Sequence, residues 1–108
     1  MKGETSLGGI KILNGKYKGA EIALNPEQEL LIGRDVHFCQ FVIESSWVSR
    51  IHVKIQYDDK KNCYKITDQS KHGTFDADKK KLPNGETVEF DKNSILNIGL
   101  DGIQILLM

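Results

Sequence analysis

The chain has 108 residues and a mass of 12.2 kDa, enough for one domain with one hydrophobic core and too little for a second lobe. Its 15 Lys and Arg residues balance its 15 Asp and Glu residues, so no overall field attracts nucleic acid or an anionic membrane. The apolar runs are far shorter than the roughly 20 residues of a membrane span. We therefore expect a soluble, cytoplasmic, monomeric domain over residues 1–108, with its core within 9–107 and no nucleic-acid or membrane partner.

Short runs of alternating or β-branched apolar residues predict strands along the whole chain. In order, they lie at residues 9–13, 20–24, 29–33, 41–43, 52–57, 63–67, 87–90, 95–99 and 103–107. The run 52–57 is the clearest, because Val53, Ile55 and Tyr57 alternate with polar residues. Glycine and β-branched residues interrupt every window long enough for an amphipathic helix of three turns. Many short strands close together predict an all-β sandwich or barrel.

Three Asn-Gly or Asp-Gly pairs stand between these runs. Asn14-Gly15, Asn84-Gly85 and Asp101-Gly102 supply residues that tolerate the positive φ of hairpin turns. We therefore expect hairpins at all three. The lysine triplet 79–81 is expected to cover a turn as solvated charge.

The cysteines and two of the large aromatic residues are interpreted as core. Cys39 and Cys63 have apolar or β-forming neighbours and no signal peptide is evident, so buried thiols are expected rather than a disulfide. Trp47 and Phe38 are also expected to be buried, because a small sandwich needs bulky anchors.

The histidines show no pattern that indicates a metal site. His37, His52 and His72 are scattered, without the short paired spacing of zinc ligands. No metal and no cofactor are predicted.

Residues 47–52, WVSRIH, place Ser49 three positions before His52. A serine nucleophile needs a base within hydrogen-bond reach, a group that orients the base, and donors for the oxyanion. Ser49 lacks the G-x-S-x-G elbow, and only a turn leading into a strand at Val53 would bring it to His52, with Asp68 as a nominal acid partner. A hydrogen-bonded histidine at a strand start is the better interpretation, so we expect no enzyme.

Three polar stretches at predicted strand ends indicate a different chemistry. Arg34 follows one strand, Ser49 and Arg50 precede another, and Lys71 lies in the glycine loop 70–75. Strand ends of a sandwich gather at one edge, so the three loops are able to converge there. A guanidinium grips two phosphate oxygens at once, and further cations and a hydroxyl would complete a basic hollow suited to a dianionic phosphate ester.

The order of these motifs resembles the forkhead-associated (FHA) domain. The matching motifs are Gly33-Arg34, S-R-x-H at 49–52 and Gly73-Thr74, and the resemblance runs from Ile10 to Leu107. It implies a β-sandwich of two largely antiparallel sheets with eleven strands, which binds phosphothreonine peptides through loops at one end.

The resemblance also implies roles for individual residues. Arg34 and Ser49 are expected to contact the phosphate directly. The full set expected to bind the phosphopeptide is Arg34, Ser49, Arg50, Lys71, His72 and Thr74. The residues expected to support the loops are Gly33, His52 and Gly73.

Three positions depart from the family pattern. His72 replaces an asparagine that holds the peptide backbone, Ala77 aligns with a second asparagine, and Lys92-Asn93 replaces the usual Gly-Asp. The leading hypothesis is a module that recruits a protein phosphorylated on threonine by a Ser/Thr kinase. The alternatives are a module of the same fold that binds an unphosphorylated protein and, behind it, a small hydrolase built on Ser49 and His52.

Overall fold

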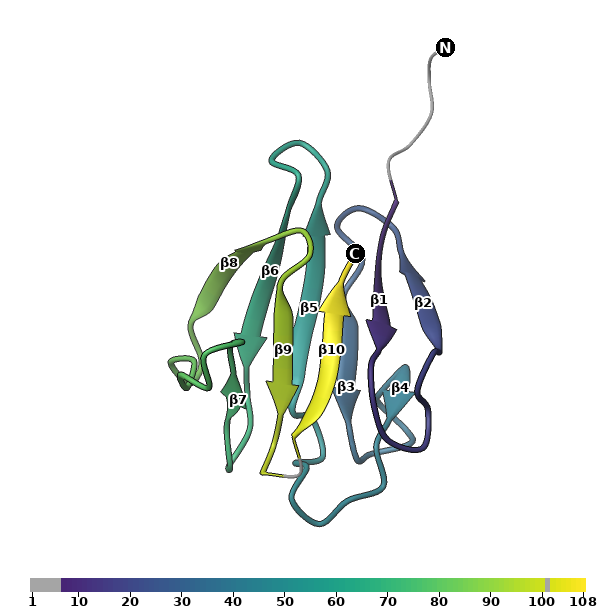
Figure 1. The fold of residues 1–108 in the computed structure, drawn as a ribbon, viewed down its shortest axis with the longest axis vertical. Helices are drawn as coiled ribbons and strands as arrows, with labels where there is room; N and C mark the ends of the chain where they lie inside the picture. The colour runs from purple at the N-terminus through teal and green to yellow at the C-terminus, as the bar shows by residue number, and fades with distance from the viewer. Residues whose placement is uncertain (1–6, 101) are drawn as a thin grey trace.

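The structure is a computed structural model and describes residues 7–100 and 102–108. Its strands form two five-stranded sheets packed face to face (Figure 1). The first sheet has the order β2-β1-β10-β9-β7 and contains β1 (Gly8–Ile12), β2 (Glu21–Leu24), β7 (Thr74–Phe75), β9 (Ile95–Ile98) and β10 (Ile103–Leu107). The second has the order β4-β3-β5-β6-β8 and contains β3 (Leu30–Gly33), β4 (Phe41–Val42), β5 (Val53–Asp58), β6 (Cys63–Asp68) and β8 (Thr87–Asp91).

The predicted fold class is confirmed. Every named strand pair is antiparallel except β3 with β4, and the predicted strand bounds agree with the observed ones to within one residue. The described residues form ten strands instead of the eleven that the resemblance implied. Between β7 and β8 the chain forms two isolated bridges, Lys81 with Phe75 and Asn84 with Asp68, and neither extends into a strand. The described residues contain no helix long and apolar enough to cross a membrane.

One hydrophobic core lies between the two sheets. The alternation in β5 is as predicted: Val53, Ile55 and Tyr57 are buried and the residues between them are half-buried. Cys39 and Cys63 are buried and unpaired, as expected. Other fully buried side chains are Ile10, Ile12, Leu24, Leu30, Ile32, Ile66, Leu96, Ile98, Ile105 and Leu107. Each contributes roughly 2 kcal/mol on burial, so these aliphatic contacts hold the sheets together.

The expectation that Trp47 and Phe38 belong to the core is wrong. The two residues are 45% and 60% exposed, in the loops on either side of β4. The aromatic anchors of the core are instead Tyr57 and Tyr64, whose ring centroids lie 5.0 Å apart. Tyr64 keeps its hydroxyl satisfied by accepting the N–H of Gly9 at 2.9 Å.

The three predicted hairpin turns have different outcomes. The chain reverses between β1 and β2 through the longer loop 13–20, where Gly15 has a φ of 79°. Asn84-Gly85 does not form a hairpin, because it connects β7 and β8, which belong to different sheets. Gly102 has a φ of 69° in the predicted reversal from β9 to β10, whereas Asp101 lies outside the described residues.

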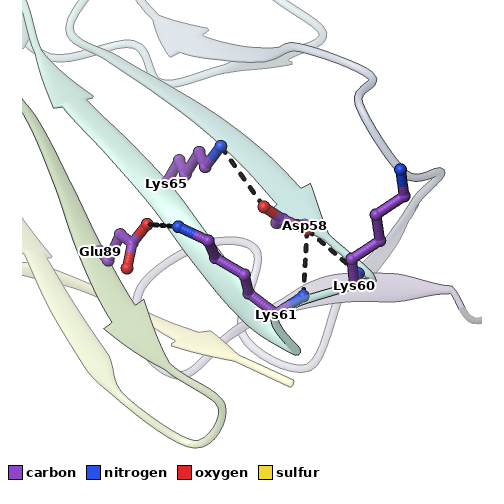
Figure 2. A network of polar contacts seen from close by, with 5 residues as sticks. All are labelled: Asp58, Lys60, Lys61, Lys65 and Glu89. Atoms are coloured by element: carbon purple, nitrogen blue, oxygen red, sulfur yellow. Dashed lines mark hydrogen bonds and ion pairs between the residues drawn. The ribbon is translucent and has the colours of Figure 1, made fainter.

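Charged residues at the β5–β6 turn are bonded to one another (Figure 2). Oδ1 of Asp58 accepts the N–H groups of Lys60 and Lys61 at 3.0 and 3.1 Å, and Oδ2 lies 3.4 Å from Nζ of Lys65. The N–H of Lys61 and then the Lys65 ammonium lower the pKa of Asp58. Lys61 also pairs with Glu89 at 3.1 Å. This end of the sandwich therefore uses its charges to brace a hairpin.

Candidate functional site

Four connections gather at the opposite end of the sandwich (Figure 1). The N–H of Arg34 donates to the carbonyl of Ser49 at 2.9 Å, and the N–H of Gly99 donates to that of Gly73 at 3.0 Å. These bonds join the β3–β4 loop to the β4–β5 loop, and the β6–β7 loop to the β9–β10 connection. The predicted convergence of the three polar loops is therefore present.

Gly33 permits the close approach of the first two loops. A Cβ at this position would lie 2.2 Å from the carbonyl oxygen of Arg50, a distance that real atoms do not adopt. Gly33 is not among the positive-φ glycines, so this close approach, and not a left-handed backbone, is what requires glycine here. The same Arg50 carbonyl accepts the N–H of Asp35 and the thiol of Cys39, each at 3.1 Å, which anchors the β3–β4 loop.

His52 connects the second loop to the third. Its ring is fully buried, Nδ1 accepts the N–H of Ser49 at 3.0 Å, and Nε2 lies 2.8 Å from the carbonyl of Gly73. Because Nδ1 accepts, the neutral ring carries its proton on Nε2 and donates it to Gly73. Burial lowers the pKa of His52, opposed in part by the Gly73 carbonyl and by Asp68. The interpretation of His52 as a hydrogen-bonded residue at a strand start is confirmed.

The hydroxyl of Ser49 is held by the third loop. Its Oγ accepts the N–H of Lys71 at 2.9 Å, which leaves the hydroxyl proton available to donate elsewhere. It does not hydrogen-bond His52, both of whose ring nitrogens are occupied by backbone groups. The described contacts therefore contain no nucleophile–base pair, and the hydrolase hypothesis has no geometric support.

A buried polar network around Asp68 shapes the third loop. Oδ1 of Asp68 accepts the N–H and the hydroxyl of Ser70, at 3.1 and 2.6 Å. The hydroxyl oxygen of Ser70 accepts the N–H of Gly73 at 2.7 Å. The side-chain amide of Asn84 donates to the backbone carbonyl of Ser70 at 2.9 Å. The sequence did not predict that Ser70 and Asn84 support this loop, although Asp-x-Ser is a signal for an Asx turn.

Thr74 belongs to this network and not to the exposed surface. Its side chain is fully buried, and its hydroxyl donates to Oδ1 of Asp68 at 2.9 Å. The expected peptide contact through the Thr74 side chain is therefore corrected to a supporting role. The described part of the chain leaves no buried side-chain polar atom without a hydrogen-bond partner, so the loop is fully satisfied internally.

The cationic side chains around Ser49 are, in contrast, exposed. Arg34, Arg50 and Lys71 form no ion pair with the residues that the structure describes, and the ion pairs present involve other lysines. The carboxylate of Asp35 accepts the N–H of His37 at 2.8 Å and is not paired with Arg34. Arg50 follows Ser49 along the chain, and the backbone N–H groups of Arg34 and Lys71 bond to Ser49, so three exposed cationic residues adjoin it.

His72 stands beside this surface with an aromatic neighbour. Its half-buried ring meets the ring of Trp47 edge-on, with centroids 5.2 Å apart and an interplanar angle of 76°. The pair bridges the second and third loops. Trp47 was missed as a site residue because its apolar ring suggested the core.

The model of the FHA domain family matches residues 30–99. The chain belongs to the FHA family. FHA domains are interaction modules and not enzymes. Among solved structures, the FHA domain of CT664 from Chlamydia trachomatis is 25% identical, covers 95% of this chain and 97% of its own, and has a TM-score of 0.81. No curated protein sequence matches the chain.

Two further FHA domains share the fold at lower identity. The FHA domain of an Arabidopsis thaliana hypothetical protein is 20% identical, with 99% of this chain and 92% of that chain covered and a TM-score of 0.81. The MEK1 FHA domain, solved in complex with a HOP1 phosphothreonine peptide, is 16% identical, with 94% of each chain covered and a TM-score of 0.76.

One departure of this FHA domain from the family pattern lies in the turn before β9. Asn93, the second residue of the Lys92-Asn93 pair, adopts a φ of 72° and donates its N–H to the carbonyl of Leu107 at 2.6 Å. Asparagine tolerates this conformation better than most residues with a side chain, so it suits this turn.

Proposed function

We propose that this FHA domain binds phosphothreonine peptides and so recruits partners phosphorylated by a Ser/Thr kinase. The observation that carries the proposal is the hydroxyl of Ser49, fixed by the N–H of Lys71 and adjoined by cationic residues that form no ion pair in the described chain. The phosphothreonine complex of the structurally similar MEK1 domain supports it. The two buried, unpaired cysteines suit a reducing compartment, so we place the domain in the cytoplasm, as a monomer without cofactor.

In this proposal each group meets the phosphate in a distinct way. The guanidinium of Arg34 binds two phosphate oxygens, the Ser49 hydroxyl donates to one, and Arg50 and Lys71 add positive charge beside them. Hydrogen bonds to charged groups contribute about 1.5–3 kcal/mol each, so Arg34 and Ser49 dominate the affinity. His52 and the Asp68 network hold the loops in place before the ligand arrives, which reduces the entropic cost of binding.

A phosphothreonine peptide library, with the same sequences unphosphorylated as the control set, tests the proposal. We expect the domain to retain phosphorylated members only. Equal retention of both sets would contradict phosphate recognition. It would support a second candidate, in which the exposed Trp47 and its neighbour His72 contact an unphosphorylated protein.

His72→Asn is expected to tighten phosphothreonine-peptide binding about fivefold, which corresponds to about 1 kcal/mol or one net hydrogen bond. An asparagine side chain offers two amide protons and a carbonyl on a short stem, whereas neutral imidazole offers one donor and one acceptor across a rigid ring. Titration calorimetry near neutral pH measures the difference. Equal or weaker binding by the variant would show that His72 and its contact with Trp47 have a role of their own.

A further inference from the structure

The lysine triplet 79–81 lies in an ordered turn and not in a loose charged loop. The N–H of Asp76 donates to the carbonyl of Lys80, and the N–H of Lys79 donates back to the carbonyl of Asp76, both at 2.9 Å. Oδ1 of Asp76 accepts the N–H groups of Asp78 and Lys80, also at 2.9 Å. Lys79 completes the reversal with a φ of 63°. The backbone that carries the three ammonium groups is therefore fixed.

Lys81 leaves this turn beside the third binding loop. It is bridged to Phe75, and the next residue, Leu82, is buried and donates its N–H to the carbonyl of Thr74 at 2.9 Å. Cε of Lys81 lies 3.0 Å from the place where a Cβ of Gly73 would be. The absence of a side chain at Gly73 thus makes room for the stem of Lys81, which packs against the third loop.

A hollow of about 230 Å³ is bordered by Lys79 and by Phe75, the bridge partner of Lys81. Its lining consists of Phe75, Lys79, Asn97, Gly99, Leu100 and Gly102. Leu100 is 58% exposed, and the amide of Asn97 is occupied by the carbonyl of Asp76 at 3.0 Å. Gly99, which lines the hollow, donates its N–H to the carbonyl of Gly73 in the third loop.

The ammonium groups around this hollow lack a counter-charge within the protein. None of the lysines 79–81 forms an ion pair with a residue that the structure describes. The nearest carboxylate along the chain, that of the exposed Asp78, forms no ion pair with them in the described structure, and Oδ1 of Asp76 accepts two backbone N–H groups. The site therefore favours an anion from outside the chain.

The position of Lys81 sets the expected distance between this anion and the phosphate. Consecutive Cα atoms are about 3.8 Å apart, so Gly73 and the Lys81 stem against it lie on the order of 10 Å from the Lys71 N–H that holds Ser49. An extended peptide advances roughly 3.3 Å per residue. A side chain that reaches Lys81 is therefore roughly two to four residues from the phosphothreonine.

We propose that Lys81, with Lys79 beside it, forms an anion subsite that selects phosphothreonine peptides carrying a second anionic side chain at that spacing. The inference rests on the proposed function and specifies its ligand class. A carboxylate and a second phosphate share the required chemistry. Partners are then proteins whose phosphothreonine lies in an acidic or multiply phosphorylated segment.

Matched peptides and matched variants test the subsite. Phosphothreonine peptides with Gln, Glu or phosphoserine at each position two to four residues before and after the phosphothreonine are titrated against three proteins, wild type, Lys81→Gln and Lys80→Gln. The two variants each remove one exposed positive charge from the same turn, so general charge attraction is equal in both. Melting temperatures of all three proteins check that the turn is intact.

Wild type is expected to prefer an anionic residue over Gln about threefold at one spacing, and more at low salt. Lys81→Gln should lose the preference while binding the Gln peptide as wild type does, and Lys80→Gln should retain it. A preference for Glu identifies an acidic segment, and a stronger one for phosphoserine identifies a second phosphate. An unchanged preference in Lys81→Gln, or none in wild type, overturns the subsite alone. If no phosphothreonine peptide binds wild type, the proposed function falls and the subsite with it.

Discussion

Arg34→Ala is expected to weaken phosphothreonine-peptide binding about a hundredfold, a loss on the order of 3 kcal/mol. The variant removes a two-pronged, charge-assisted contact with the phosphate. The fold should be unaffected, because the Arg34 side chain is exposed and the bond that ties this loop to Ser49 uses the backbone N–H.

Calorimetry with one phosphothreonine peptide measures this loss. Lys60→Ala is the matched control, since Lys60 is an exposed cation at the opposite end of the sandwich (Figure 2). Arg34→Lys keeps the charge but lacks the planar guanidinium, so its affinity should lie between those of Arg34→Ala and Lys60→Ala. Binding by Arg34→Ala within about threefold of wild type, a deficit of only ~0.6 kcal/mol, would show that Arg34 is not the anchor.

His52→Ala is expected to lower the free energy of unfolding by about 3 kcal/mol and to weaken binding as well. The substitution empties a buried site and leaves the N–H of Ser49 and the carbonyl of Gly73 without their partner. Denaturant titration measures the change, with His37→Ala, an exposed histidine, as the control. Unchanged stability with lost binding would instead make His52 a direct ligand contact.

The same histidine gives the unliganded domain a pH-dependent stability. Burial lowers the pKa of His52 in the folded state below its ordinary value of 6.5. Between the two values the unfolded chain binds more protons, so stability rises with pH through this window. Its contribution is complete above the unfolded pKa and declines as the pH falls toward the folded one. Unfolding curves from about pH 7.5 to 5.5 should show this decline in wild type, and His52→Ala should lack this part of it.

The two sets of residues at this end of the domain differ in their use of hydrogen bonds. His52, Asp68 and Thr74 are fully buried and their polar atoms are bonded within the protein. Arg34 and Lys71 are exposed and form no ion pair in the described chain. The first set should therefore control stability and the second affinity, and the Arg34 and His52 variants separate the two.

The strands, the fold class and the order of the binding motifs were predictable from the sequence, because these features are local. A strand places alternate side chains on opposite faces. The buried face of Val53, Ile55 and Tyr57 was therefore predictable without knowledge of the segments that pack against it. Gly33-Arg34 and the Ser49 to His52 motif likewise specify residue types at short spacing.

The loops carry no such period, and there only the tertiary structure decided which side chains are exposed. Trp47 is exposed although its bulk predicted burial, and Thr74 is buried although the family resemblance predicted a ligand contact, because the burial of a loop residue depends on segments distant in sequence. The need for glycine at Gly33 comes from the approach of the Arg50 carbonyl, and Lys81 reaches the third loop because Gly73 leaves space for it. The residues in each of these contacts are separated in sequence, so only the folded chain brings them together.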